Sequence, residues 1–319
     1  MSDTAPLVSI IIATYNWSSV LRYALQSVLG QTFASYELLV IGDGCTDDSA
    51  DVVAAANDPR IRWHNLPRNS GNQSLPNNTG MEMARGKCIA YHGHDDIWHP
   101  SHLERLAQAM QGGDYDLGHT LCAMIGPGDS GMRILCGMFK SGSFGPDDAL
   151  PPTSIMHTRS AAQALGGWKD YRTCSLPPDR EFISRLRTLR HRVVAVNELT
   201  VFKFNAAWRK NCYREKPSHE QADYLHRMRT EPDFIAKEWL AITRAYAFGN
   251  TKPPFKAQGP RNLADAPPGS IIEQWRRERG LEPNEMPDSP RRPLGRQLVK
   301  KSKRGLRRMF QSLARRLED

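Results

Sequence analysis

Three apolar runs of strand length, separated by helix-like segments, constrain the fold of this 319-residue chain most strongly. The first run covers residues 7–13 and is rich in β-branched side chains, and the other two lie within the predicted strands 37–41 and 87–91. Continuous apolar strands of this kind are typical of parallel sheets, in which both faces are buried. Helix-like segments begin near Ser18 and Ser49. This alternation predicts an α/β fold with a Rossmann-like, mostly parallel sheet and flanking helices.

Polar residues follow each apolar run. Thr14 and Tyr15 come after the first run, Asp43 after the second, and the pair Asp95 and Asp96 after the third. In an open α/β sheet, ligands bind just beyond the carboxyl ends of the strands. Paired carboxylates placed there suit a divalent cation such as Mg²⁺ or Mn²⁺, which also takes oxygens from a diphosphate. The alternative is a surface turn in which one carboxylate caps the following helix.

The net charge of +9 belongs to the C-terminal tail. Residues 291–319 contain 11 Lys or Arg and 2 Asp or Glu, which leaves 32 residues of each sign in residues 1–290. Apolar residues of the tail fall near one helical face, so the tail predicts a cationic amphipathic helix in peripheral contact with an anionic membrane. A solvated tail and a helix packed on the body are the alternatives. Nucleic-acid binding is a third and less favoured alternative, because the tail lacks a repeated interleaving of aromatic residues with the charges.

The remaining composition predicts a cytoplasmic protein. No apolar run approaches the roughly 20 residues that span a bilayer, and the N-terminus does not resemble a signal peptide. Six cysteines show no C-x-x-C spacing, which favours a reducing compartment.

A series of short motifs resembles the family 2 glycosyltransferases. These are residues 8–16, 25–32 and 37–48, Asn69-x-Gly71, Asn78-x-Gly80, Ala84-x-Gly86 and Asp95-Asp96-x-Trp98. The similarity is dense over about residues 6–112 and thinner around 165–168 and 178–182. The resemblance implies the GT-A fold and inverting transfer of a sugar from a nucleotide-sugar donor.

The resemblance also implies a nucleotide site. Thr14 and Tyr15 match the strand edge that cradles the base, and Asp43 matches the carboxylate that accepts the imide N–H of uracil or thymine. Arg68 lies in a loop that often contacts the base or the diphosphate. Gly42 departs from the family pattern, because many relatives carry Asp there.

The catalytic and metal-binding residues come from the same resemblance. Asp95 matches the residue that holds the ribose or the water shell of the metal, and Asp96 matches the direct ligand of Mn²⁺ or Mg²⁺. Asp179 matches the catalytic base, although Glu181 is an alternative and Asp179 could instead interact with the dipole of its own helix. His219 could complete the metal shell, but a lone His is usually unremarkable.

These assignments predict four segments: a nucleotide-sugar-binding half (1–112), an acceptor-binding half (113–210), a helical extension with linkers (211–290) and the basic tail (291–319). The predicted activity is metal-dependent, inverting transfer from a UDP- or dTDP-sugar to a hydroxyl of a glycan or lipid-linked acceptor in cell-surface polysaccharide synthesis. The alternatives are an inactive nucleotide-sugar-binding scaffold and a nucleotidyltransferase of similar fold.

Overall fold

The structure is a computed structural model that describes residues 6–139, 150–188, 192–252 and 267–278. The chain divides into a unit of residues 1–284 and a second unit of residues 285–319. The predicted amphipathic tail, residues 291–319, lies outside the described residues, so that prediction is not tested by the structure.

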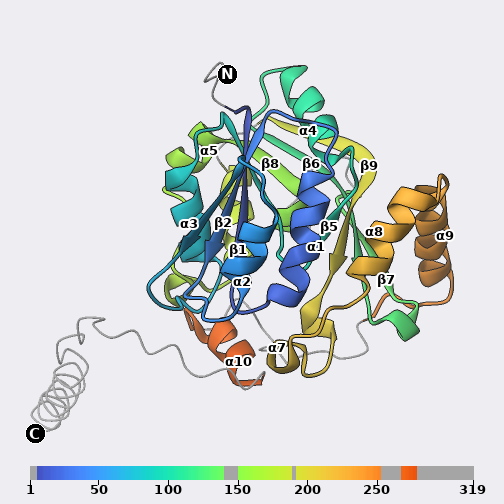
Figure 1. Cartoon of the computed structure of the whole chain (residues 1–319). Coiled ribbons are helices and arrows are strands. Elements are labelled where there is room, and N and C mark those ends of the chain that lie inside the picture. Colours follow the sequence, from blue (N-terminus) through green and yellow to red (C-terminus); the bar gives the residue numbers. More distant parts are fainter. Residues whose placement is uncertain (1–5, 140–149, 189–191, 253–266, 279–319) are drawn as a thin grey trace, which may run out of the picture. The chain divides into compact units, whose positions relative to one another are not determined.

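The described part of the first unit is built on one nine-stranded sheet (Figure 1). Its strands are β1 (Val8–Thr14), β2 (Tyr36–Gly42), β3 (Ile61–Asn65), β4 (Cys88–Tyr91), β5 (Ile97–Trp98), β6 (Leu117–Ile125), β7 (Arg133–Cys136), β8 (Ile155–Thr158) and β9 (Val193–Phe204). The order is β3-β2-β1-β4-β8-β6-β9-β5, and β7 pairs with β6. Strands β3, β2, β1 and β4 are parallel, whereas β8 is antiparallel to both β4 and β6. The parallel half therefore brings the ends of β1, β2 and β4 to one edge.

Ten helices are described. They are α1 (Ser18–Leu29), α2 (Ser49–Ala55), α3 (Ser74–Met83), α4 (His102–Gln111), α5 (Arg159–Ala164), α6 (Pro178–Thr188), α7 (Cys212–Glu215), α8 (Gln221–Thr230), α9 (Phe234–Ala247) and α10 (Ser270–Glu278). The α/β fold with a sheet flanked by helices and a helical C-terminal extension was predicted correctly.

Alternation along β1 separates two hydrophobic cores. Ile10 and Ile12 pack toward α1 and α4, while Ile11 packs on the opposite face with side chains from α5 and α6. All three isoleucines are fully buried. A period of two therefore places successive side chains of one strand in different layers, which is why the strand reads as continuously apolar.

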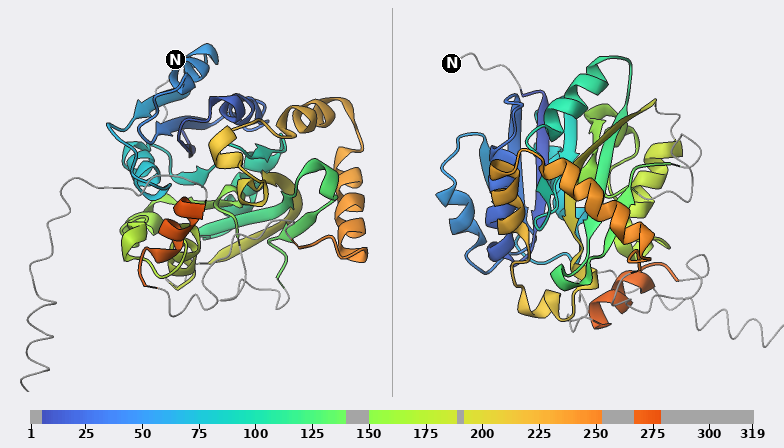
Figure 2. Two further views of the ribbon diagram at one scale, coloured as in Figure 1. Left: turned by 90° about the horizontal axis from the view of Figure 1, so that it is seen from below. Right: turned by 90° about the vertical axis from the view of Figure 1, so that its right-hand side faces the viewer.

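The C-terminal extension adds a third core and part of the site. Helices α8 and α9 pack against β6 and β9, with Tyr224 and Phe234 beside Phe202. Helices α7 and α10 lie at the end of the sheet where the parallel strands terminate (Figures 1 and 2). Segments distant in sequence therefore reach the carboxyl edge of β1 and β2.

Two local predictions were wrong. The sequence predicts separate strands at 193–196 and 200–204, but β9 is continuous and accommodates Asn197 and Glu198 through register shifts opposite Thr120 and Leu121. The sequence also predicts loop positions for four histidines, His92, His94, His99 and His102. The first three do lie in loops, whereas His102 begins α4. His92 and His102 are both buried against the ring of Trp98, with centroid distances of 4.4 and 4.3 Å. Neutral imidazoles can pack there as flat aromatic rings.

Candidate active site

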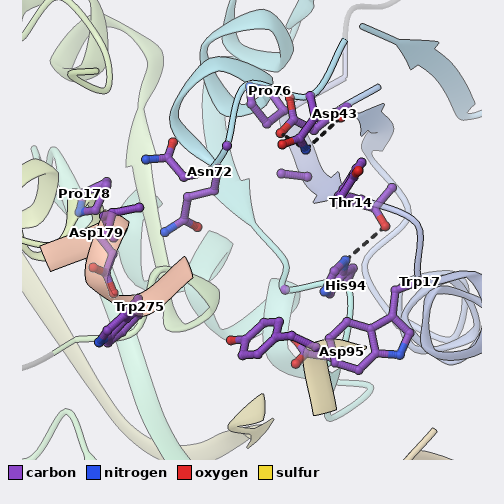
Figure 3. A pocket seen from close by; sticks show the side chains of 18 of the residues that line it. Thr14, Trp17, Asp43, Asn72, Pro76, His94, Asp95, Pro178, Asp179 and Trp275 are labelled. Carbon is purple, nitrogen blue, oxygen red and sulfur yellow. Dashed lines mark hydrogen bonds between the residues drawn. The ribbon is translucent and has the colours of Figure 1, made fainter. Parts of the chain in front are cut away.

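A cavity of about 360 Å³ opens at the carboxyl edge of β1, β2 and β4 (Figure 3). Five of the seven predicted site residues line it, namely Thr14, Tyr15, Asp43, Asp95 and Asp179. Asp43 and Thr14 lie on one side of the cavity, and Asp179 lies on the other (Figure 3). The cavity therefore brings together residues that are up to 165 positions apart in the sequence, from Thr14 to Asp179.

Asp43 is held rigidly at the end of β2. Its Oδ1 accepts a hydrogen bond of 2.9 Å from the Ser70 amide, and its Oδ2 accepts one of 2.9 Å from the Asn69 side chain. The residue is 4% exposed, and burial raises its pKa while hydrogen bonds from Ser70 oppose that shift. The loop at 69–71 thus fixes the orientation of the carboxylate toward the cavity.

The departure at Gly42 has a steric cause. A Cβ added there would lie 2.4 Å from Asn65 Oδ1 and 2.7 Å from the ring of Trp63. Asn65 cannot easily move, because its Oδ1 accepts a 2.8 Å hydrogen bond from the amide of Cys45. The Asp that the family pattern would place at this position therefore has no room unless Trp63 and Asn65 both shift.

Asp95 and Asp96 have different environments. Asp95 lines the cavity and is 8% exposed, whereas Asp96 is fully buried and is not among the lining residues. The Nζ of Lys203 lies 3.2 Å from Asp96 Oδ2 and 3.5 Å from Oδ1, and Lys203 itself lines the cavity. Burial raises the pKa of both carboxyl groups, and the Lys203 charge opposes both shifts.

These donors fit a divalent cation only in part. A Mg²⁺ or Mn²⁺ ion in an enzyme is often held by one or two carboxylates together with substrate phosphates. Asp95 meets that requirement, because its side chain is at the cavity surface. Asp96 is already paired with Lys203, and no group of three or more His, Cys, Asp or Glu able to hold a metal occurs among the described residues. Asp96 as a direct metal ligand remains a prediction.

Asp179, the predicted catalytic base, faces the cavity. It lies in the first turn of α6, is partly exposed, and its Oδ1 accepts a 2.9 Å hydrogen bond from the Arg180 amide. The alternative, Glu181, is held in ion pairs of 2.8 Å with Lys169 and 2.7 Å with Arg185. Glu181 does not line the cavity, so the geometry favours Asp179 as a proton acceptor.

Residues 9–133 match the sequence profile of a family described as glycosyl transferase family 2. These residues belong to that family. The chain is 30% identical over 146 residues to the poly(ribitol-phosphate) β-N-acetylglucosaminyltransferase TarP of Staphylococcus aureus, covering 45% of this chain and 44% of TarP. The first curated relatives that it matches are covered over about a third of their own length.

Solved structures show the same fold. S. aureus TarS in complex with UDP-GlcNAc is similar with a TM-score of 0.54 at 19% identity, covering 62% of this chain and 58% of that one. The mannosyltransferase PcManGT of Pyrobaculum calidifontis, in complex with GDP-Man and Mn²⁺, has a TM-score of 0.51 at 14% identity, with coverages of 77% and 76%. The GT-A fold implied by the sequence motifs is therefore confirmed.

Within the described residues, every helix is too short or too polar to cross a membrane.

The other predicted residues of the donor site differ in how they lie relative to the cavity. Thr14 is buried, and its Oγ1 lies 3.0 Å from His94 Nδ1. Tyr15 is 37% exposed, and the Lys216 ammonium lies 5.1 Å from the centre of its ring. Arg68 is exposed and is not among the lining residues, so its role in donor binding remains a prediction.

Two residues with alternative roles have structural partners outside the cavity. His219 Nε2 lies 3.1 Å from the Sγ of Cys212 and does not line the cavity. Trp168, for which the sequence favours core or acceptor-wall packing over a specific sugar platform, is 3% exposed and stacks on Phe182 with ring centroids 4.4 Å apart. Both residues therefore have packing roles in this structure.

Sequence reasoning missed several lining residues that follow the family segment. They are Lys203, Tyr213, Lys216, Ile272, Trp275 and Arg276. The only signal for α10 was an apolar pair, Ile271 and Ile272, followed by Trp275 in an otherwise polar region. Such a pattern predicts a buried helical face but does not say where the helix docks.

Proposed function

We propose that this protein is an inverting glycosyltransferase that moves a sugar from a nucleotide-diphosphate sugar to a hydroxyl group of an acceptor. The observation that carries the proposal is the single cavity lined by Asp43, Asp95 and Asp179. A single displacement requires a donor site and a proton acceptor on the opposite side of the reacting carbon. Asp43 and Asp179 lie on opposite sides of this cavity (Figure 3).

The reaction proceeds by one exchange of bonds. The acceptor oxygen forms a bond to the anomeric carbon as the bond from that carbon to the diphosphate oxygen breaks. Asp179 takes the proton of the attacking hydroxyl, and the electron pair of the broken bond leaves with the diphosphate. Lys203 presents positive charge at the cavity beside Asp95, where it stabilises the leaving group. When bound, a Mn²⁺ or Mg²⁺ ion held by Asp95, with Asp96 as a second ligand, would supply further positive charge to the diphosphate.

We propose a UDP- or dTDP-sugar as the donor. Asp43 accepts hydrogen bonds from Ser70 and Asn69, and its remaining lone pairs can accept the imide N–H of a pyrimidine base. Thr14 and Tyr15 form the adjoining wall at the end of β1. The TarS complex contains UDP-GlcNAc, whereas PcManGT contains GDP-Man, so proteins of this fold bind different bases.

The acceptor class rests on the relatives. TarP is named for transfer to poly(ribitol-phosphate), and this chain is 30% identical to part of it. We therefore propose an acceptor hydroxyl on a cell-surface glycan or its lipid-linked precursor. Synthesis on a lipid-linked precursor fits a cytoplasmic location with peripheral membrane contact through residues 291–319, where the positive charge is concentrated.

The test is a thermal-shift panel of UDP-, dTDP- and GDP-sugars with and without Mn²⁺, followed by a donor hydrolysis assay. Ligands that bind only the folded state raise the midpoint of unfolding. We expect uridine or thymidine nucleotides to raise it and Asp179→Asn to lower turnover by about a thousandfold. Binding without turnover in the wild type would support the inactive scaffold. A sugar phosphate and a nucleoside triphosphate consumed together would instead identify a nucleotidyltransferase.

A further inference from the structure

Helix α10 contributes to the candidate site although it lies far beyond the family 2 segment, which ends at residue 133. Ile272, Trp275 and Arg276 all line the cavity. Ile271 and Ile272 are 5% and 9% exposed, so one face of the helix is buried against the body of the protein. The exposed face includes Glu273 and Arg277. The helix is therefore docked in a defined orientation, with Arg276 and Arg277 on different sides.

Arg276 connects α10 to the loop that positions Asp43. Its Nη1 donates a hydrogen bond of 2.9 Å to the carbonyl oxygen of Gly71. The two preceding residues of that loop, Asn69 and Ser70, donate hydrogen bonds to the Asp43 carboxylate. Arg276 and Asp43 are thus joined through a single short loop, residues 69–71, which is hydrogen-bonded to both.

The start of α10 is hydrogen-bonded to the segment before α6, on the side of the cavity where Asp179 lies. The amide of Gly269 donates a 2.9 Å hydrogen bond to the carbonyl oxygen of Cys174, a few residues before Asp179. Gly269 has a φ of +79° and lies so close to Arg172 that a Cβ would be 3.0 Å from its Cα. Trp275 lies on the same side of the cavity as Asp179 (Figure 3). The helix therefore spans from the segment before α6 to the loop at 69–71.

The charges around the cavity indicate what Arg276 does there. The charged lining residues are Asp43, Asp95, Asp179, Lys203, Lys216 and Arg276. Three negative and three positive groups balance, but without Arg276 the carboxylates would outnumber the cations. A nucleoside diphosphate carries negative charge of its own, so its binding depends on each cation that faces the cavity. Arg276 is one of the three cationic side chains that line the cavity, and it is the only one of them on α10.

We propose that α10 is a wall of the donor site, in which Arg276 provides positive charge and Trp275 an aromatic surface to the bound nucleotide-sugar. This inference rests on the proposed function, because it takes the ligand to be a nucleoside diphosphate or its sugar ester. Aromatic side chains combined with a few placed polar groups are typical of small-molecule sites. Docking of α10 and binding of the donor then reinforce each other, since both use the loop at 69–71.

Two neighbouring arginines provide a matched test. Arg276→Ala and Arg277→Ala remove the same charge from adjacent positions of one helix, but only Arg276 lines the cavity. Calorimetric titration of the full chain with UDP should give about a tenfold weaker Kd for Arg276→Ala. Arg277→Ala should bind within about twofold of the wild type, and Trp275→Ala should weaken binding of the sugar donor more than of UDP.

Hydrogen exchange gives a second readout that needs no variant. Saturating UDP should slow amide exchange in residues 270–278 of the wild-type protein, because a docked helix opens less often. Equal UDP affinity for the Arg276 and Arg277 variants, or unchanged exchange in α10, would overturn the inference. A wild type that binds no nucleotide at all overturns the proposed function itself, so the two failures are distinguishable.

Discussion

The ammonium group of Lys203 lies 3.2 Å from the carboxylate of Asp96, which is completely buried beneath the cavity. The two residues are 107 positions apart and come from β9 and the turn after β4. The Lys203 side chain is 24% exposed, so its charge faces both the buried carboxylate and the cavity. This pair sets the electrostatic environment of the site before any ligand binds.

Removing the lysine charge should destabilise the fold. Lys203→Met leaves the buried Asp96 carboxylate without a partner, and breaking a buried ion pair in this way costs about 3 kcal/mol or more of the free energy of unfolding. Urea unfolding of the variant measures the loss. Lys203→Arg, which keeps the charge, should retain most of the stability. If Lys203→Met unfolds at the same urea concentration as the wild type, the pair does not stabilise Asp96 as the geometry indicates.

The two adjacent carboxylates should have separable roles. Asp95→Asn removes a carboxylate at the cavity surface, so we expect a near-normal unfolding midpoint but about a hundredfold lower transfer rate. The additional stabilisation that Mn²⁺ gives in the presence of UDP should also disappear. Asp96→Asn leaves the Lys203 charge without its buried partner, and the unfolding midpoint should fall. Identical behaviour of the two variants would contradict this division.

Asp179 and Glu181 provide a matched pair for the catalytic base. Asp179→Asn should lower the transfer rate by about a thousandfold while UDP affinity stays unchanged, because a general base acts only on the attacking hydroxyl. Glu181→Gln should keep most of the transfer rate but lose stability, since its ion pairs with Lys169 and Arg185 are broken. Steady-state kinetics and thermal unfolding on both variants check the assignment. A larger loss of rate in Glu181→Gln would move the base to that residue.

Local patterns predicted the half of the site that is built on β1, β2 and β4. Apolar runs fixed these strands, and the parallel arrangement brings Thr14, Asp43 and Asp95 together at one edge. Asp179 came from the family resemblance, and it faces the same cavity. Periodicity and a family motif together were sufficient to place these residues at the cavity, because each of them lies in a recognisable motif or directly after a recognisable strand.

The remaining half depends on contacts between distant segments. Lys203 lies in a strand that the sequence divides in two, because the exposed polar residues Asn197 and Glu198 resemble a turn rather than an irregularity in one strand. The docking position of Arg276 depends on a Gly71 carbonyl 205 residues earlier. Neither the continuity of β9 nor the contact between Arg276 and Gly71 can be read from the local sequence. The spacing of side chains shows which face of a helix or strand is apolar, but not which segment that face packs against.

The buried histidines predict how stability depends on pH. Burial lowers the pKa of His92 and of His119 to about 4, and both side chains are at most 2% exposed. Below the ordinary value of about 6.5, the unfolded chain binds protons that these folded residues do not. Each histidine therefore makes its full contribution to the free energy of unfolding above pH 6.5. As the pH falls from 6 to 4, each histidine lowers that free energy by about 1.4 kcal/mol per pH unit.

A substitution that removes one of these titrating imidazoles tests the predicted direction of the pH dependence of stability. His119 packs against Phe139 with ring centroids 5.0 Å apart, so His119→Phe keeps an aromatic ring while removing the titrating group. Urea unfolding at several pH values between 7 and 4 should show a shallower acid loss for this variant than for the wild type. An acid loss as steep as that of the wild type would contradict the assignment. The carboxyl groups of Asp43 and Asp95 have raised pKa values and shift stability in the opposite direction, but they are common to both proteins and cancel in the comparison.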